Sequence, residues 1–294
     1  MAITVSIPSN FDLSTMYPVI GETINDELRP RSKTINFDFS RLAWAAPDGM
    51  TVLSNLIEWL KKRGVTGSFI GCNPKNRAQQ YMDDCGFFEE YSNGPLRETN
   101  AVRSTTQQIR KVACAGSVEW LDQLIPWLSD CLGTTKGTLA EFKTSLREIF
   151  LNIEDHSTEE IGCVHVQWFP NGGYVHFSIS DFGVGIPTEI ARVYETNSDA
   201  HALAIATREG ISSKRNGRNR GAGLAYLIDN AVGRYGGRVA IHSNRGKLEC
   251  SRSSGKLEKK PIRVVGYYPG TLISIVLLTD RIRRLEDTRE DFEW

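Results

Sequence analysis

The segment "SLREIFLNIEDH", residues 145–156, carries Glu148, Asn152 and His156 at intervals of four residues. In a helix, each step of four residues advances only about 40° around the axis, so these three side chains share one face. The opposite face is apolar and consists of Leu146, Ile149, Phe150 and Ile153. The pattern predicts an amphipathic helix whose polar stripe is either solvated or one wall of a site.

The composition is that of a folded globular chain without a charge bias. The chain has 294 residues, 40% hydrophobic and 24% charged, which accommodates two domains with a core each. Lys plus Arg and Asp plus Glu both number 35, so the formal net charge of zero argues against a general nucleic-acid binder. No apolar run approaches the roughly 20 residues of a membrane-spanning helix, and no secretory signal is visible. We therefore expect a cytoplasmic protein that binds neither membranes nor nucleic acid.

The cysteines are scattered and form no C-x-x-C pair. They are Cys72, Cys85, Cys114, Cys131, Cys163 and Cys250. This spacing argues against a zinc site. We expect free thiols in a reducing compartment, most of them small core residues.

The first 95 residues alternate between strand-like and helix-like segments. Strand patterns occupy residues 3–8, 33–42 and 66–72, and helical patterns occupy residues 11–28, 49–64 and 76–87, of which 49–64 reads as amphipathic. This alternation predicts a sheet with helices packed against it. The polar segment 96–107 directly follows Gly94 and Pro95 and is the predicted linker.

The pattern of the following residues predicts a second domain at residues 108–280. Two long helices are expected at residues 117–132 and 138–156, followed by two strands joined by Asn-Gly-Gly, a strong hairpin signal. Strand-like stretches at 238–244, 261–268 and 271–279 close the domain, and residues 281–294 read as an exposed, charged tail. The chain as a whole is expected to be an α/β (α+β) protein.

A further motif follows the second strand of the hairpin. "VHFSIS" runs directly into Asp181, which is followed by Gly183, Gly185 and Ile186. Alternate glycines let the backbone approach a ligand closely, and the aspartate offers an acceptor for an exocyclic amine. The same spacing is common in ordinary turns.

Two more glycine-bearing segments lie downstream. Gly221 and Gly223 stand at the mouth of a predicted helix, where backbone N–H groups and the helix dipole suit a phosphate chain. Gly270 and Thr271 open an apolar strand. Each motif alone is weak, but all of them in a fixed order and in the proper strand or helix context favour one nucleotide site.

In this order the motifs resemble those of the GHKL ATPases, or Bergerat fold, over residues 108–280. The family's N box, adenine-binding box and phosphate box resemble, respectively, Glu148-x-x-x-Asn152-x-x-x-His156, Asp181-x-Gly183-x-Gly185 and Gly221-Ala222-Gly223-Leu224. The segment before the phosphate box is similar to the lid of the anti-sigma-factor serine kinase branch. The resemblance implies an α/β sandwich that binds ATP and Mg²⁺ under a mobile lid.

The resemblance also assigns roles to individual residues. Asn152 would coordinate the Mg²⁺ that bridges the ATP phosphates, and Glu148 would polarise an attacking water or protein hydroxyl. Asp181 would accept a hydrogen bond from the adenine amine, with Thr271 near the same base. For His156 two interpretations stay open, contact with phosphate and bracing of the helix end. His165 and His176 each lie in a strand of alternating pattern and are expected to be sheet-face residues.

The predicted lid is basic. Between Thr207 and Gly221 it carries one acid, Glu209, against five cations, which are Arg208, Lys214, Arg215, Arg218 and Arg220. It is either a solvated loop or a cover whose cations reach the γ-phosphate. Ala225 departs from the family, which usually has a further glycine there, so the resemblance supports nucleotide binding more firmly than hydrolysis.

Residues 1–95 resemble a STAS domain, the fold of anti-sigma-factor antagonists, through "INFDFSRLAWAAPDGMTVLSNLIEWLKKRG". Asp48 stands where that family has its phosphorylated serine. Two interpretations stay open: the aspartate imitates phosphoserine, or it caps the following helix.

Three functions agree with these motifs. The first is an ATP-binding regulatory protein whose nucleotide state controls binding of a protein partner, with slow ATP hydrolysis. The second is a serine/threonine kinase acting on a separate partner, and the third is a non-enzymatic module that holds ATP as a structural ligand. A sensor histidine kinase fits poorly because the helices at 117–156 contain no histidine besides His156. The chain also ends soon after the last strand, which argues against an enzyme that acts on DNA strands. The oligomeric state is left open, a homodimer included.

Overall fold

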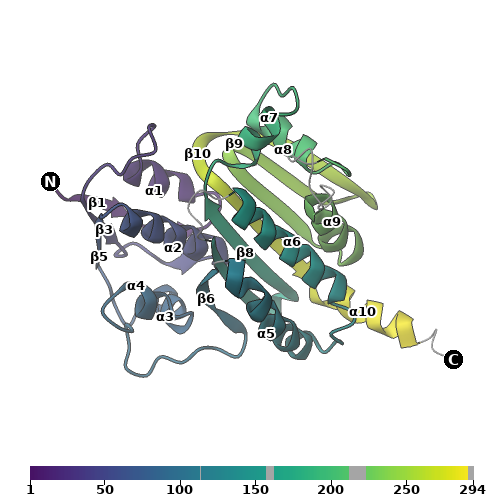
Figure 1. The fold of residues 1–294 in the computed structure, drawn as a ribbon. Coiled ribbons are helices and arrows are strands. Elements are labelled where there is room, and N and C mark those ends of the chain that lie inside the picture. The colour runs from purple at the N-terminus through teal and green to yellow at the C-terminus, as the bar shows by residue number, and fades with distance from the viewer. Residues whose placement is uncertain (113, 157–161, 212–222, 291–294) are drawn as a thin grey trace.

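The computed structural model describes residues 1–112, 114–156, 162–211 and 223–290. Within these ranges the chain has an α+β fold with both parallel and antiparallel sheets, as the alternation of patterns predicts. Figure 1 shows the N-terminal helices and strands on one side of a larger sheet, with the C-terminal helix α10 at the far end.

The N-terminal part is built on a parallel sheet in the order β1-β3-β5. Its strands are β1 (Ile3–Ser6), β3 (Thr34–Asp38) and β5 (Thr66–Ile70). A short parallel pair, β2 (Asn10–Phe11) and β4 (Trp44–Ala45), lies beside it. The helices are α1 (Met16–Thr23), α2 (Pro47–Lys62), α3 (Arg77–Asp84) and α4 (Phe87–Tyr91). The prediction of a sheet with packed helices is confirmed.

The second sheet is antiparallel, in the order β6-β7-β8-β10-β9. Its strands are β6 (Thr106–Val112), β7 (Gly162–Phe169), β8 (Tyr174–Phe182), β9 (Arg238–Ser253) and β10 (Lys256–Leu278). The predicted hairpin is present between β7 and β8, where Gly173 has a φ of +66°. The last two predicted strands are one continuous strand, β10, whose register shifts between Arg263 and Thr271 absorb the break in the sequence pattern.

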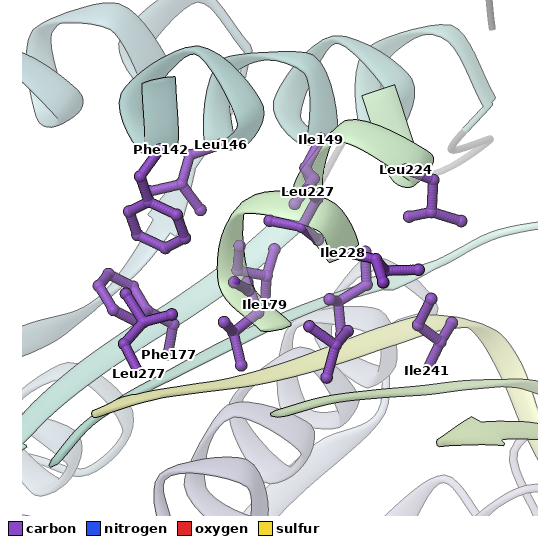
Figure 2. Close-up of a cluster of buried hydrophobic side chains, with 14 of the residues drawn as sticks. Phe142, Leu146, Ile149, Phe177, Ile179, Leu224, Leu227, Ile228, Ile241 and Leu277 are labelled. Carbon is purple, nitrogen blue, oxygen red and sulfur yellow. The ribbon is translucent and has the colours of Figure 1, made fainter. Parts of the chain in front are cut away.

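Helices α5 (Cys114–Leu132), α6 (Ala140–His156) and α9 (Gly223–Ile228) cover one face of this sheet. Figure 2 shows Leu146 and Ile149 of α6, with Leu227 of α9, above Ile179 and Ile241 of the strands. The apolar face predicted for α6 is therefore the face that packs on the sheet. Smaller elements complete this end of the chain: α7 (Ile186–Ala191), α8 (Asp199–Ala206) and a π-helical turn, η2 (Asp229–Arg234).

Helix α2 differs from the prediction of an amphipathic helix. Every residue from Pro47 to Leu60 is buried, because α2 lies between the parallel sheet and the opposite face of the antiparallel sheet. Trp59 of α2 meets Phe182 of β8 edge to face, with ring centroids 6.3 Å apart. One hydrophobic cluster thus joins residues of both parts of the chain.

The C-terminal segment also differs from the expected exposed tail. It forms helix α10 (Thr279–Glu290), in which Ile282 is fully buried. The Nε of Arg283 donates a hydrogen bond to the carbonyl oxygen of Leu132 on α5, at 2.7 Å. The mixed charges of this segment obscured its apolar residues Ile282 and Leu285, both of which pack against the hydrophobic core. The division into domains at 96–107 stays a prediction, although β6 already begins at Thr106.

Candidate functional site

Asp181 lies at the end of β8 and is 8% exposed. Directly opposite on β10 is Thr271, which is equally buried. Burial raises the pKa of Asp181 to about 7, although hydrogen bonds from the backbone N–H groups of Asp181 and Thr271 oppose the shift. The strand end therefore holds a carboxyl group that is costly to ionise and has no cationic partner among the groups that shift its pKa.

The turn after Asp181 is packed tightly against neighbouring strands. The N–H of Gly183 donates to the carbonyl oxygen of Pro269 at 3.1 Å. Gly185 has a φ of +78°, and a Cβ at this position would lie 2.6 Å from Oδ1 of Asn244. Gly270 has a φ of +135°, and a Cβ there would lie 2.3 Å from the carbonyl oxygen of Asp181. These glycines are required by contacts within the chain itself.

Two residues of β9 belong to this site and are missed by the sequence motifs. Ser243 is fully buried, and its Oγ accepts a hydrogen bond from the N–H of Ile186 at 3.1 Å. Asn244 has a φ of +52°, and its Nδ2 donates to Oγ1 of Thr188 at 3.0 Å. The only signal in the sequence is the pair of small polar residues that ends the apolar stretch "RVAIH".

Glu148 and Gly223 come from motifs that lie far apart in the sequence, and the structure brings them together. A Cβ on Gly223, at the start of α9, would lie 2.9 Å from Cβ of Glu148 on α6. Glu148 is half-buried. Leu224 belongs to the hydrophobic core, and Ala225 is buried beside it. The N-terminus of α9 and the acidic side chain of Glu148 are therefore adjacent.

Part of the predicted site lies outside the described residues. The backbone of Asn152 and His156 belongs to α6, but the structure does not describe their side chains. Most of the lid and the first half of the phosphate box also fall outside the described ranges, which stop at residue 211 and resume at residue 223. The predicted site residues and lid cations that this leaves out are Lys214, Arg215, Arg218, Arg220, Gly221 and Ala222. Their predicted roles stay predictions.

Asp48 is neither a helix cap nor an accessible charge. The residue that caps α2 is Ala46, and Asp48 is only 3% exposed. Its Oδ2 lies 3.1 Å from Nε2 of His176 on β8 and accepts a hydrogen bond from Oγ of Ser274 at 3.2 Å. Burial acts to raise the pKa of Asp48, but His176 and hydrogen bonds from neighbouring serines outweigh it and lower the pKa. The cap interpretation is wrong, and a phosphoserine mimic would face the protein's own sheet.

Two more histidines on this sheet face contact tyrosines of the N-terminal part. Nε2 of His165 lies 3.4 Å from the hydroxyl of Tyr81, and Nδ1 of His242 lies 2.6 Å from the hydroxyl of Tyr17. Burial lowers the pKa of His165 to about 3 and that of His242 to about 4. The prediction that His165 and His176 are sheet-face residues is confirmed.

The cysteines described by the structure are free thiols, as expected. Cys85, Cys163 and Cys250 are buried, and burial raises the pKa of the Cys85 and Cys250 thiols to about 12. They are core residues with little thiolate character at neutral pH.

A pocket of about 350 Å³ lies between α1 and the bulged part of β10. Tyr17 and Tyr267 line it, together with Arg31 and Arg245. Pro269, whose carbonyl receives the N–H of Gly183, is a further lining residue. No sequence motif indicates this pocket.

Within the described ranges, no cluster of three or more His, Cys, Asp or Glu side chains is arranged to hold a metal ion. None of the helices in the same part of the chain has the length and apolar character needed to cross a membrane. No protein-family model matches the chain, and no curated protein matches it.

Proposed function

We propose that this chain is an ATP-binding regulatory protein with a GHKL-type domain, in which bound Mg-ATP controls the binding of a protein partner. The observation that carries the proposal is the pairing in space of distant motifs. Asp181 stands opposite Thr271, and Glu148 lies against Gly223. This pairing supports a site with a purine end and a phosphate end.

The purine end is supported by the chemistry of Asp181. Among the described residues no cation contributes to the pKa shift of Asp181. A buried carboxyl group in this environment, at a strand end, suits a ligand that brings its own N–H donor. The adenine amine is such a donor, whereas guanine presents a carbonyl oxygen at the corresponding position. The proposal therefore includes discrimination in favour of adenine.

The phosphate end is supported by Gly223 at the mouth of α9. A helix mouth offers backbone N–H groups to a phosphate, and the neighbouring Glu148 suits the activation of water or a hydroxyl. Asn152, one turn further along α6, is the proposed Mg²⁺ ligand because a carboxamide oxygen is a hard donor that Mg²⁺ accepts. The metal would neutralise phosphate charge when bound.

A serine/threonine kinase acting on a separate partner is the second candidate. Asp48, which occupies the aligned acceptor position, is buried and carries no hydroxyl. Asp48 itself cannot accept the phosphoryl group as a serine would, so this candidate function places the acceptor on a separate protein.

The test combines calorimetry with incubation in γ-labelled ATP. We expect Mg²⁺-dependent binding of ATP, no binding of GTP, and loss of most ATP affinity in Asp181→Asn, with the exposed Asp26→Asn as matched control. Label released as phosphate supports slow hydrolysis, label on a lysate protein supports the kinase, and retained label supports a non-hydrolysing module. Equal affinity for GTP, or unchanged ATP affinity in Asp181→Asn, would contradict the proposed purine end.

A further inference from the structure

Ser243, Thr271 and Asp181 form a row across three neighbouring strands. Ser243 of β9 stands opposite Thr271 of β10, which stands opposite Asp181 of β8. Residues directly opposite one another in an antiparallel sheet point to the same face. All three side chains are buried. The row therefore extends the proposed purine end of the site to β9, one strand beyond the strands that carry the sequence motifs.

The hydroxyl of Ser243 joins two separate segments of the chain at the purine end of the site. It accepts a hydrogen bond from the N–H of Ile186 at 3.1 Å, at the end of the turn that follows Asp181. It donates to the carbonyl oxygen of Gly270, which precedes Thr271. Its Oγ also lies 3.3 Å from Oγ1 of Thr271. A hydroxyl has one donor and two acceptor sites, so these three contacts use its full capacity.

The same contacts explain why the turn needs Gly185. A Cβ at Gly185 would lie 2.7 Å from Oγ of Ser243 and 3.1 Å from the carbonyl oxygen of Gly270. The turn is therefore seated directly on the Ser243 hydroxyl, with no room for a side chain between them.

We propose that Ser243 is a positioning residue for the purine end of the site, holding the Gly185–Ile186 turn against Gly270–Thr271. The nucleotide part of this inference rests on the proposed function. The hydroxyl proton of Ser243 goes to the carbonyl of Gly270, so Thr271 must donate its own proton to Ser243 or to a ligand. Thr271 can turn to a ligand acceptor while Ser243 still keeps the N–H of Ile186. Ser243 thus leaves Thr271 free to bind without leaving a buried oxygen unpaired.

The variants separate the hydroxyl from the shape of the side chain. Ser243→Ala removes the hydroxyl, whereas Ser243→Thr and Ser243→Val add the same bulk and differ only in a hydroxyl against a methyl group. The matched control is Ser251→Ala, an exposed serine on the same strand. If Ser243→Ala fails to fold, the Thr and Val pair still isolates the hydroxyl.

The first readout is amide hydrogen exchange without nucleotide. We expect the N–H of Ile186 to exchange at least about tenfold faster in Ser243→Ala, and faster in Val than in Thr, with no change in Ser251→Ala. Unchanged protection of Ile186 in Ser243→Ala would overturn the inference, whether or not the protein binds nucleotide.

The second readout compares Mg-ATP with Mg-tripolyphosphate, which lacks the purine. We expect the Kd for ATP to rise about tenfold in Ser243→Ala, while the Kd for tripolyphosphate stays unchanged, because only the purine end loosens. A general loss of stability would weaken both ligands equally and would overturn the positioning role. If the wild type binds no ATP, the proposed function fails, and hydrogen exchange alone then decides whether Ser243 holds the turn.

Discussion

Asp181 sits in an environment that disfavours its own charge. It is almost fully buried, and burial is the largest cause of its raised pKa. A group of this kind costs stability when it ionises without a ligand. In the proposed function that cost has a purpose, because a ligand that donates an N–H to the carboxylate relieves it.

This cost gives a prediction at the scale of one residue. Because the pKa of Asp181 is higher in the folded protein than in the unfolded chain, the folded state binds more protons between about pH 4 and pH 7. The contribution of Asp181 to the free energy of unfolding is therefore largest below pH 4 and is lost as the pH rises to 7. Asp181→Asn should be more stable than the wild type at pH 8, by up to about 4 kcal/mol, and similar to it near pH 4.

Urea unfolding of both proteins at pH 4.5, 6 and 8 measures this difference. Asp26→Asn, an exposed aspartate, is the matched control and should follow the wild type throughout. A stability difference for Asp181→Asn that does not grow with pH would show that Asp181 ionises without cost.

At the scale of the element, helix α2 is unusual because a helix of sixteen residues is buried around nearly its whole length. Its first turn lies against β2, where the carbonyl oxygen of Phe11 accepts the N–H of Ala46 at 2.9 Å. This bond brings the strand so close that the same turn of the helix has space only for a glycine at position 49. A Cβ at Gly49 would lie 2.4 Å from the same carbonyl oxygen.

The surroundings of two helical glycines therefore predict opposite effects of a glycine-to-alanine substitution on stability. A Cβ at Gly21 in α1 would meet no atom within 4 Å beyond its own helical turn, so Gly21→Ala should stabilise the protein by about 0.5 to 1 kcal/mol. Gly49→Ala should destabilise it by about 1 to 3 kcal/mol, because alanine overpacks the contact with Phe11. Chemical denaturation of both variants measures the two free energies of unfolding. Stabilisation by Gly49→Ala would mean that β2 does not hold this position against α2.

At the scale of the whole molecule, the two parts of the chain meet through a hydrophobic cluster and through buried polar contacts, among them those of Asp48. The pair of the buried Asp48 and the largely buried His176 links α2 to β8, and Oγ of Ser274 on β10 donates a further hydrogen bond to Asp48. Removing one partner of a buried pair leaves the other charge or dipole without compensation. The pair therefore makes the packing of the N-terminal part depend on the antiparallel sheet.

The buried pair gives a prediction about stability. Asp48→Ser should destabilise the protein by about 3 kcal/mol or more, whereas a helix cap would tolerate serine almost without loss. Asp48→Asn combined with His176→Gln should cost less than the sum of the two single changes, since each alone leaves an unpaired group. The double-mutant cycle is measured by urea unfolding at pH 7. Additive costs would show that Asp48 and His176 do not interact.

Local spacing was sufficient to predict several elements of this protein. The period of four in residues 145–156 and the Asn-Gly-Gly turn before Tyr174 depend on neighbours in the chain, and both are present in the structure. The strand that carries Asp181 near its end and the helix that begins at Gly223 are also predicted from patterns of consecutive residues. Helical and strand periodicity report which face is apolar, and this information is contained in consecutive residues.

The tertiary structure alone decided what those faces meet. Nothing in the residues around Asp48 indicates His176, and nothing around Ser243 indicates that its hydroxyl would join Ile186 to Gly270. Helix α2 reads as amphipathic because its polar residues are evident in the sequence. The strands β7 and β8, which cover these residues, come from a part of the chain about a hundred or more positions further on. Such contacts depend on packing between distant segments, and a sequence pattern contains only the spacing within one segment.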